Sequence, residues 1–116
     1  MTDAQHSVRF GWLLDFYGPL LTQKQHRVAR LRWEEDLTYQ EIGETLCITR
    51  QGVYDMLRKV ETQLVVYEEK LGLLDRYLNM RKGILECTRL IDEGAQGEAI
   101  KACLEQMLKK EGSHGV

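Results

Sequence analysis

The sequence has a single proline, no long apolar run and no excess of positive charge. Its longest unbroken apolar stretch, residues 64–67, is far shorter than the ~20 residues that a membrane-spanning helix needs. The net charge of -2 and the pI near 5.9 exclude a protein that holds nucleic acid by bulk positive charge, although a local basic surface is compatible with them. Residues 1–6 lack the basic start and apolar centre of a signal peptide. We therefore expect a soluble, cytoplasmic protein.

The residue patterns of catalytic and metal sites are also missing. Cys47, Cys87 and Cys103 are widely spaced and form no CxxC pair, which disfavours a disulfide framework or a structural zinc site. We interpret Cys87 and Cys103 as buried, reduced thiols. The histidines have no cysteine or carboxylate at ligand spacing, and there is no glycine-rich phosphate loop. We expect no catalytic residue, no metal and no cofactor, and hence no enzyme.

Helical periodicity runs through almost the whole chain, without sustained strand alternation. It predicts a first helix over residues 8–17, which ends at Gly18 and Pro19 because proline disfavours helix in the residue before it. A second helix is predicted from Thr22 to Trp33, with Thr22 and Gln25 at capping-box spacing. The last helix is predicted over residues 98–110.

Two helix starts eleven residues apart predict a helix-turn-helix. The first start pairs Thr38 with Glu41 at capping-box spacing, and the second start is Thr49. Apolar residues flank each start at staple spacing, and only Cys47 and Ile48 separate the two helices after Leu46.

In a helix-turn-helix, the second helix lies in the major groove and its first turns meet the base edges. Because Val53, Leu57 and Val60 must face inward, the outer face is left with polar side chains and Tyr54. Arginine and glutamine can pair bidentately with guanine and adenine, and a helix amino terminus can hold a phosphate. The candidate contacts to bases are Arg50, Gln51, Tyr54 and Arg58, and those to the backbone are Thr49, Lys24, Arg27 and Arg30.

A different interpretation of the same face stays open. It is a solvated surface, or a surface that binds protein, and both Asp55 and the absence of a dense basic patch favour this alternative.

A heptad-like seam follows the helix-turn-helix. Its members are Leu57, Val60, Leu64, Tyr67, Leu71, Leu74 and Leu78. Gly72 lies inside the seam, which is therefore one kinked helix or two helices. We expect the carboxy-terminal half to form a homodimer through Leu64, Tyr67, Leu71, Leu74 and Leu78. The alternative is internal cover by Ile100, Leu104 and Met107 of the last helix.

Four segments in this order closely resemble the bacterial YlxM family of small helix-turn-helix proteins. They are Leu14–Thr22, Tyr39–Gly43, Thr49–Asp55 and Tyr67–Gly72. The resemblance covers about residues 10–78 and implies a helix-turn-helix similar to region four of sigma factors. It also implies a link to the signal recognition particle pathway, because genes of the family neighbour those of the particle's GTPases. The chain departs from the family pattern at Cys47, where glycine is usual, and at Gly43 and Gly52, where alanine is commoner.

The sequence thus predicts an all-α fold, with a sigma-like helix-turn-helix domain at 8–60 and a helical extension at 61–111 in a single compact unit. The expected function is that of a winged-helix-like, nucleic-acid-binding regulator of transcription associated with the signal recognition particle pathway. DNA is the expected partner, with RNA and components of the particle as further candidates. The alternative is a protein-interaction module that acts on the particle's GTPase or RNA-protein complex and never reads DNA.

Overall fold

The computed structural model describes residues 3–114, and this part of the chain is helical and contains no strand. The elements are α1 Asp3–Tyr17, the 3-10 helix η1 Gly18–Leu20, α2 Gln23–Trp33, α3 Tyr39–Leu46, α4 Arg50–Leu71, α5 Leu73–Asp92 and α6 Gly97–His114. The predicted all-α fold is confirmed. The likeness to winged-helix proteins is wrong for the described residues, because a wing is built from strands and they contain none.

The chain divides into two compact units, Met1–Gly72 and Leu73–Val116. The expected boundary after residue 60 instead falls inside α4, where Val60 and Leu64 are fully buried and keep the helix in the core of the first unit. Gly72 ends α4 in a left-handed conformation, with φ 64° and ψ 24°, and its N–H donates to the carbonyl of Glu68. The seam is therefore two helices, and the chain is two units where one was expected.

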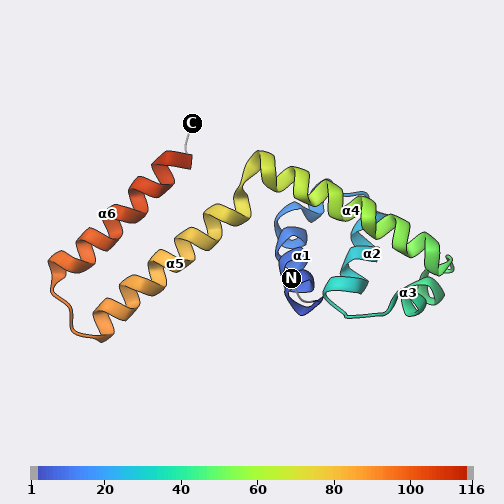
Figure 1. Ribbon diagram of the computed structural model, residues 1–116, viewed down its shortest axis with the longest axis horizontal. Coiled ribbons are helices and arrows are strands. Elements are labelled where there is room, and N and C mark those ends of the chain that lie inside the picture. The colour runs from blue at the N-terminus through green and yellow to red at the C-terminus, as the bar shows by residue number, and fades with distance from the viewer. Residues whose placement is uncertain (1–2, 115–116) are drawn as a thin grey trace. The chain divides into compact units, whose positions relative to one another are not determined.

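In the first unit, α1, α2 and α3 all pack against α4 (Figure 1). The rings of Phe10 and Trp33 stack at 5.0 Å between their centroids and join α1 to α2. α1 begins at Asp3, earlier than the predicted residue 8, and its second turn contacts α4 through His6. The His6 ring lies 4.6 Å from Phe10, and its Nε2 lies 3.1 Å from Oε1 of Glu61.

Both predicted capping boxes are present. Thr22 accepts a hydrogen bond from the N–H of Gln25, whose side chain accepts one from the N–H of Thr22. Thr38 and Glu41 exchange the same two bonds at 3.1 and 3.0 Å. These bonds satisfy N–H groups that would otherwise have no partner at the start of each helix.

The turn between α3 and α4 is built on Cys47 and Gly43. Cys47 has φ 58° and ψ 42°, the left-handed conformation that glycine usually adopts, and its side chain is exposed. The N–H groups of Cys47 and Ile48 both donate to the carbonyl of Gly43. A Cβ at Gly43 would lie 2.8 Å from the Ile48 carbonyl oxygen, so the close approach of this turn requires glycine there.

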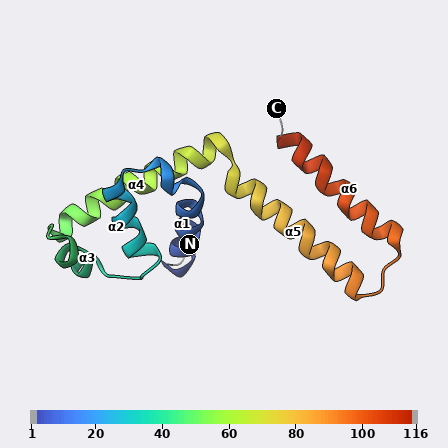
Figure 2. The same cartoon turned by 180° about the vertical axis from the view of Figure 1, so that it is seen from behind.

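In the second unit, α5 and α6 run side by side as an antiparallel hairpin (Figures 1 and 2). They meet where Gly83 faces Met107 and where the Cys87 and Cys103 sulfurs lie 3.0 Å apart. Cys87 is buried as expected, whereas Cys103 is half-buried, and both are free thiols. The hydrogen bond with Cys103 raises the pKa of the Cys87 thiol, with burial as the second cause.

The expected dimerisation seam is not one exposed stripe. Leu64 and Leu74 are buried, Tyr67 is half-buried, and Leu71 and Leu78 are exposed. The three α6 residues of the alternative differ in their burial. Ile100 and Met107 are half-buried, but Leu104 stays 48% exposed, because α6 packs against the face of α5 that carries Gly83 and Cys87.

Candidate nucleic-acid interface

The first turns of α4 present the predicted face. Arg50, Gln51, Tyr54 and Arg58 are all exposed, whereas Val53 and Leu57 on the opposite side are buried against the first unit. The side-chain oxygen of Thr49 accepts from the N–H of Gly52 at 2.9 Å and caps the helix. The other N–H groups of the first turn have no partner within the helix, and such groups are suited to binding an anion.

Gln51 is held by its own helix. Its Nε2 donates to Oδ1 of Asp55 at 2.9 Å. To pair bidentately with adenine, the amide would have to give up this bond, and the Asp55 carboxylate next to it would repel a phosphate. Arg50 has no acidic residue one turn further along the helix, so its guanidinium is not engaged in this way.

Two tyrosines, each with an arginine beside its ring, extend this face across the first unit. The Arg32 guanidinium lies 4.8 Å from the centre of the Tyr39 ring, and Arg58 lies 5.9 Å from that of Tyr54. The two tyrosine rings meet edge to face at 6.1 Å. Arg32 is anchored by a 3.0 Å hydrogen bond from its Nη1 to the carbonyl of Leu37.

Sequence reasoning missed Arg32 and Tyr39 as members of this surface. The spacing of Tyr54 and Arg58 on one helix predicts their contact, but nothing local relates Tyr39 on α3 to Tyr54 on α4. Their contact depends on how the two helices cross. Together the four side chains form a polar and aromatic surface, on which bases can stack as well as pair.

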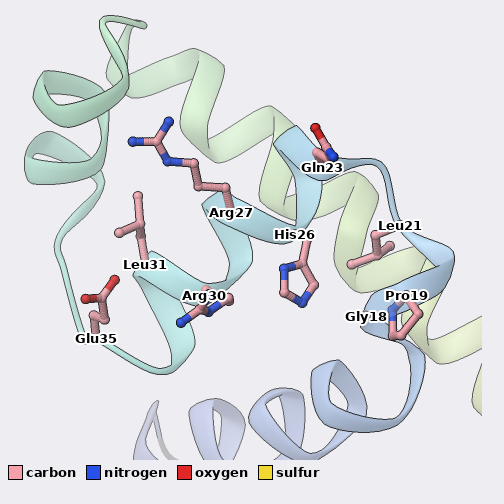
Figure 3. Close-up of a pocket in the computed structure, with 9 residues that line it drawn as sticks. All are labelled: Gly18, Pro19, Leu21, Gln23, His26, Arg27, Arg30, Leu31 and Glu35. Atoms are coloured by element: carbon pink, nitrogen blue, oxygen red, sulfur yellow. The ribbon is translucent and has the colours of Figure 1, made fainter.

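The three basic candidates on α2 are exposed, but they do not act as one row. Arg27 and Arg30 line a hollow of about 540 Å³ beside η1, which Lys24 does not line. Figure 3 shows the two arginines extending in different directions from α2, with His26 between α2 and η1. Arg30 Nε donates to Glu34 Oε2 at 3.1 Å, so part of its charge is already compensated.

Residues 3–114 contain neither a candidate metal cluster nor a candidate membrane-spanning helix. In this range, no group of three or more His, Cys, Asp or Glu side chains could hold a metal ion. Nor does the described part of the chain include a helix with the length and apolar character needed to cross a membrane.

Comparison with known proteins identifies the family. The model of the family described as "Putative helix-turn-helix protein, YlxM / p13 like" matches residues 4–108. The chain belongs to this family.

Its relatives include a UPF0122 protein of Desulforamulus reducens, 39% identical over 104 residues, which cover 84% of this chain and 89% of that one. A UPF0122 protein of Halalkalibacterium halodurans is 35% identical over 101 residues, or 87% of this chain and 93% of that one. One of Caldanaerobacter subterraneus is 49% identical over 72 residues, 62% of each chain. The family is described by its helix-turn-helix and not by a reaction.

Proposed function

We propose that this protein is a regulator that binds nucleic acid through the exposed face at the start of α4. The observation that carries the proposal is the division of α4 into a buried apolar side and an outer side where Arg50, Tyr54 and Arg58 are exposed together. Membership of a helix-turn-helix family supports it. A protein with this role acts in the cytoplasm.

Arg50 and Gln51 contact base edges in this proposal, and Thr49 offers the helix terminus to a phosphate. Lys24, Arg27 and Arg30 act on the backbone. Duplex DNA is the proposed target, because reading by a helix amino terminus requires a groove wide enough for a helix, and the major groove of RNA is too narrow. The resemblance to the YlxM family supports a further proposal, that the regulated process is the signal recognition particle pathway.

A second candidate function is favoured by the bond between Gln51 and Asp55. A surface with its own acidic group and an exposed tyrosine suits a protein partner, such as the GTPase of the particle or its RNA-protein complex. Salt separates the two functions, since binding through several phosphates weakens steeply as salt rises and a mostly apolar contact does not.

Selection from randomised DNA, followed by titration of the best site, tests the leading proposal. We expect Arg50→Ala to cost ~1–3 kcal/mol on that site and Lys24→Ala to weaken all sequences about equally. Lys70→Ala is the control, since this exposed residue lies on the same helix about 30 Å from Arg50. If neither Arg50→Ala nor Lys24→Ala changes binding, reading of the groove by α4 is excluded.

The partner itself is tested without presupposing DNA. The tagged protein is captured, and the associated DNA, RNA and protein are each identified. Recovery of the particle's RNA or GTPase with wild type, and its loss with Arg58→Ala, would support the second candidate function.

A further inference from the structure

The hairpin of α5 and α6 has almost no core of its own. Among residues 73–110, whose side chains the structure describes, only Leu74 and Cys87 are buried apolar residues. The two helices approach closely instead: a Cβ at Gly83 would lie 2.5 Å from Cγ of Met107. Small residues at the contact leave no interior in which larger side chains could be buried.

The apolar side chains of the hairpin lie on its outside. On α5, Met80, Ile84 and Ile91 are between 46% and 59% exposed, and their spacing of four and seven puts them on one helix face. On α6, Leu104 and Leu108 are 48% and 73% exposed. Met80, Ile84, Leu104, Met107 and Leu108 together line a hollow of about 380 Å³ between the helices, so both helices contribute to one apolar face.

The size of this face matches that of a dimer interface. A hairpin of two helices of about 20 residues presents roughly 30 Å by 20 Å, or about 600 Å² from each copy. Two copies then bury about 1,200 Å², the lower limit for a stable complex. A unit as small as Leu73–Val116 generally needs a disulfide, a metal or a partner chain to be stable, and among the described residues it has no disulfide and no metal cluster.

The charges of the hairpin favour a second copy as the partner. The half that contains its open end, residues 73–82 and 106–110, carries five basic side chains and one acidic one. The half that contains the loop, residues 83–105, carries two basic and five acidic side chains. Two copies arranged antiparallel place each basic half against the acidic half of the other copy, whereas a parallel arrangement places like charges together.

We propose that this face of α5 and α6 pairs with the same face of a second copy, antiparallel, to form a four-helix bundle. Such an isologous contact is closed, so it yields a dimer and no longer assembly. The residues of the interface are Met80, Ile84, Leu104, Met107 and Leu108, a set distinct from the seam that the sequence predicts. The proposal does not depend on nucleic-acid binding.

Light scattering coupled to size-exclusion chromatography tests it at tens of micromolar. We expect wild type at twice its chain mass of 13.5 kDa, and the Ile84→Glu, Leu104→Glu variant at the mass of one chain. Leu85→Glu is the matched control: Leu85 is 57% exposed, Ile84 is 51% exposed, and Leu85 is not among the residues that line the apolar hollow. We expect it to remain dimeric.

Both tryptophans, Trp12 and Trp33, lie in the first unit, so their fluorescence checks that each variant keeps this unit folded. Wild type at 13.5 kDa would overturn the dimer and leave the face to a different protein. If Leu85→Glu dissociates the dimer as much as the double variant Ile84→Glu, Leu104→Glu does, the assignment of the interface to this face is wrong.

Charge reversal tests the orientation. In the antiparallel bundle, Lys109→Glu with Lys110→Glu weakens dimerisation about tenfold, since several exposed pairs are lost together. Adding Asp92→Lys and Glu98→Lys to the same chain restores dimerisation. Each half whose charge has been reversed then faces a half of opposite charge in the other copy. If Lys109→Glu with Lys110→Glu leaves dimerisation unchanged or makes it tighter, the antiparallel arrangement is excluded.

Discussion

The hydroxyl of Tyr17 donates a 2.5 Å hydrogen bond to Oε1 of Glu68, which lies 51 positions further along the chain. Tyr17 is completely buried at the end of α1, and the bond joins that end to the last turns of α4. A phenol in a protein core needs a partner for its hydroxyl, and here the partner is a carboxylate.

Removing that hydroxyl should destabilise the first unit. We expect Tyr17→Phe to lower its free energy of unfolding by about 1.5 kcal/mol, the usual size for a hydrogen bond to a charged group. Urea unfolding followed by tryptophan fluorescence measures it. Tyr67→Phe is the control, since the Tyr67 ring lies 5.9 Å from that of Tyr17 and Tyr67 is only half-buried. Equal losses from both substitutions would mean that the bond contributes nothing specific.

Gly43 and Gly11 should respond oppositely to a methyl group. A Cβ at Gly43 meets the Ile48 carbonyl oxygen at 2.8 Å, so Gly43→Ala forces the turn apart and should cost about 1–3 kcal/mol. Gly11 lies inside α1 with no atom within 4 Å of its Cβ position, so Gly11→Ala should stabilise by about 0.5–1 kcal/mol. Both are measured by the same fluorescence-detected unfolding. A neutral Gly43→Ala would show that the turn can widen without loss.

Cys47 adopts a backbone conformation that favours glycine. Cys47→Gly should therefore stabilise the first unit, by up to ~1 kcal/mol, because it relieves the strain of a left-handed residue that carries a Cβ. Cys47→Ala is the matched control. It removes the thiol but keeps the Cβ, so we expect no comparable gain. A loss of stability in Cys47→Gly would show that the exposed thiol makes a contact of its own.

Acid should weaken the start of α3. Hydrogen bonds from the backbone and side chain of Thr38 hold the pKa of Glu41 below its ordinary value of 4.5. The stabilisation is therefore complete above pH 4.5 and is lost as the pH falls through the lowered pKa. Glu41→Gln keeps the capping box without a charge, so its stability should fall less steeply below that pH. Glu69→Gln, at an exposed position of α4, should leave the slope of wild type unchanged.

Features fixed by neighbouring residues could be predicted from the sequence. The capping boxes at Thr22 and Thr38 each depend on a few successive positions, and both predictions are confirmed. The exposure of Arg50 and Arg58 on α4 follows from helical spacing in the same way. Local rules suffice for such features, because a helix fixes which side chains share a face.

Features that depend on tertiary packing could not be predicted. The contact of Tyr39 with Tyr54 depends on the angle at which α3 crosses α4, and the approach of Cys87 to Cys103 depends on the register of a hairpin. The burial of the individual seam residues could not be predicted for the same reason. Its period of seven is equally compatible with burial at Leu64 and exposure at Leu71, and only the packed helices distinguish them.

A boundary at the single residue Gly72 has a consequence for how the protein denatures. Because the residue contacts of the chain divide at this boundary, we expect heating or urea to unfold the two units in separate steps, in which case no single melting temperature describes the chain. Tryptophan fluorescence follows the first unit alone, whereas circular dichroism follows the helices of both. If the fluorescence and circular dichroism curves do not coincide, the two units unfold independently of each other.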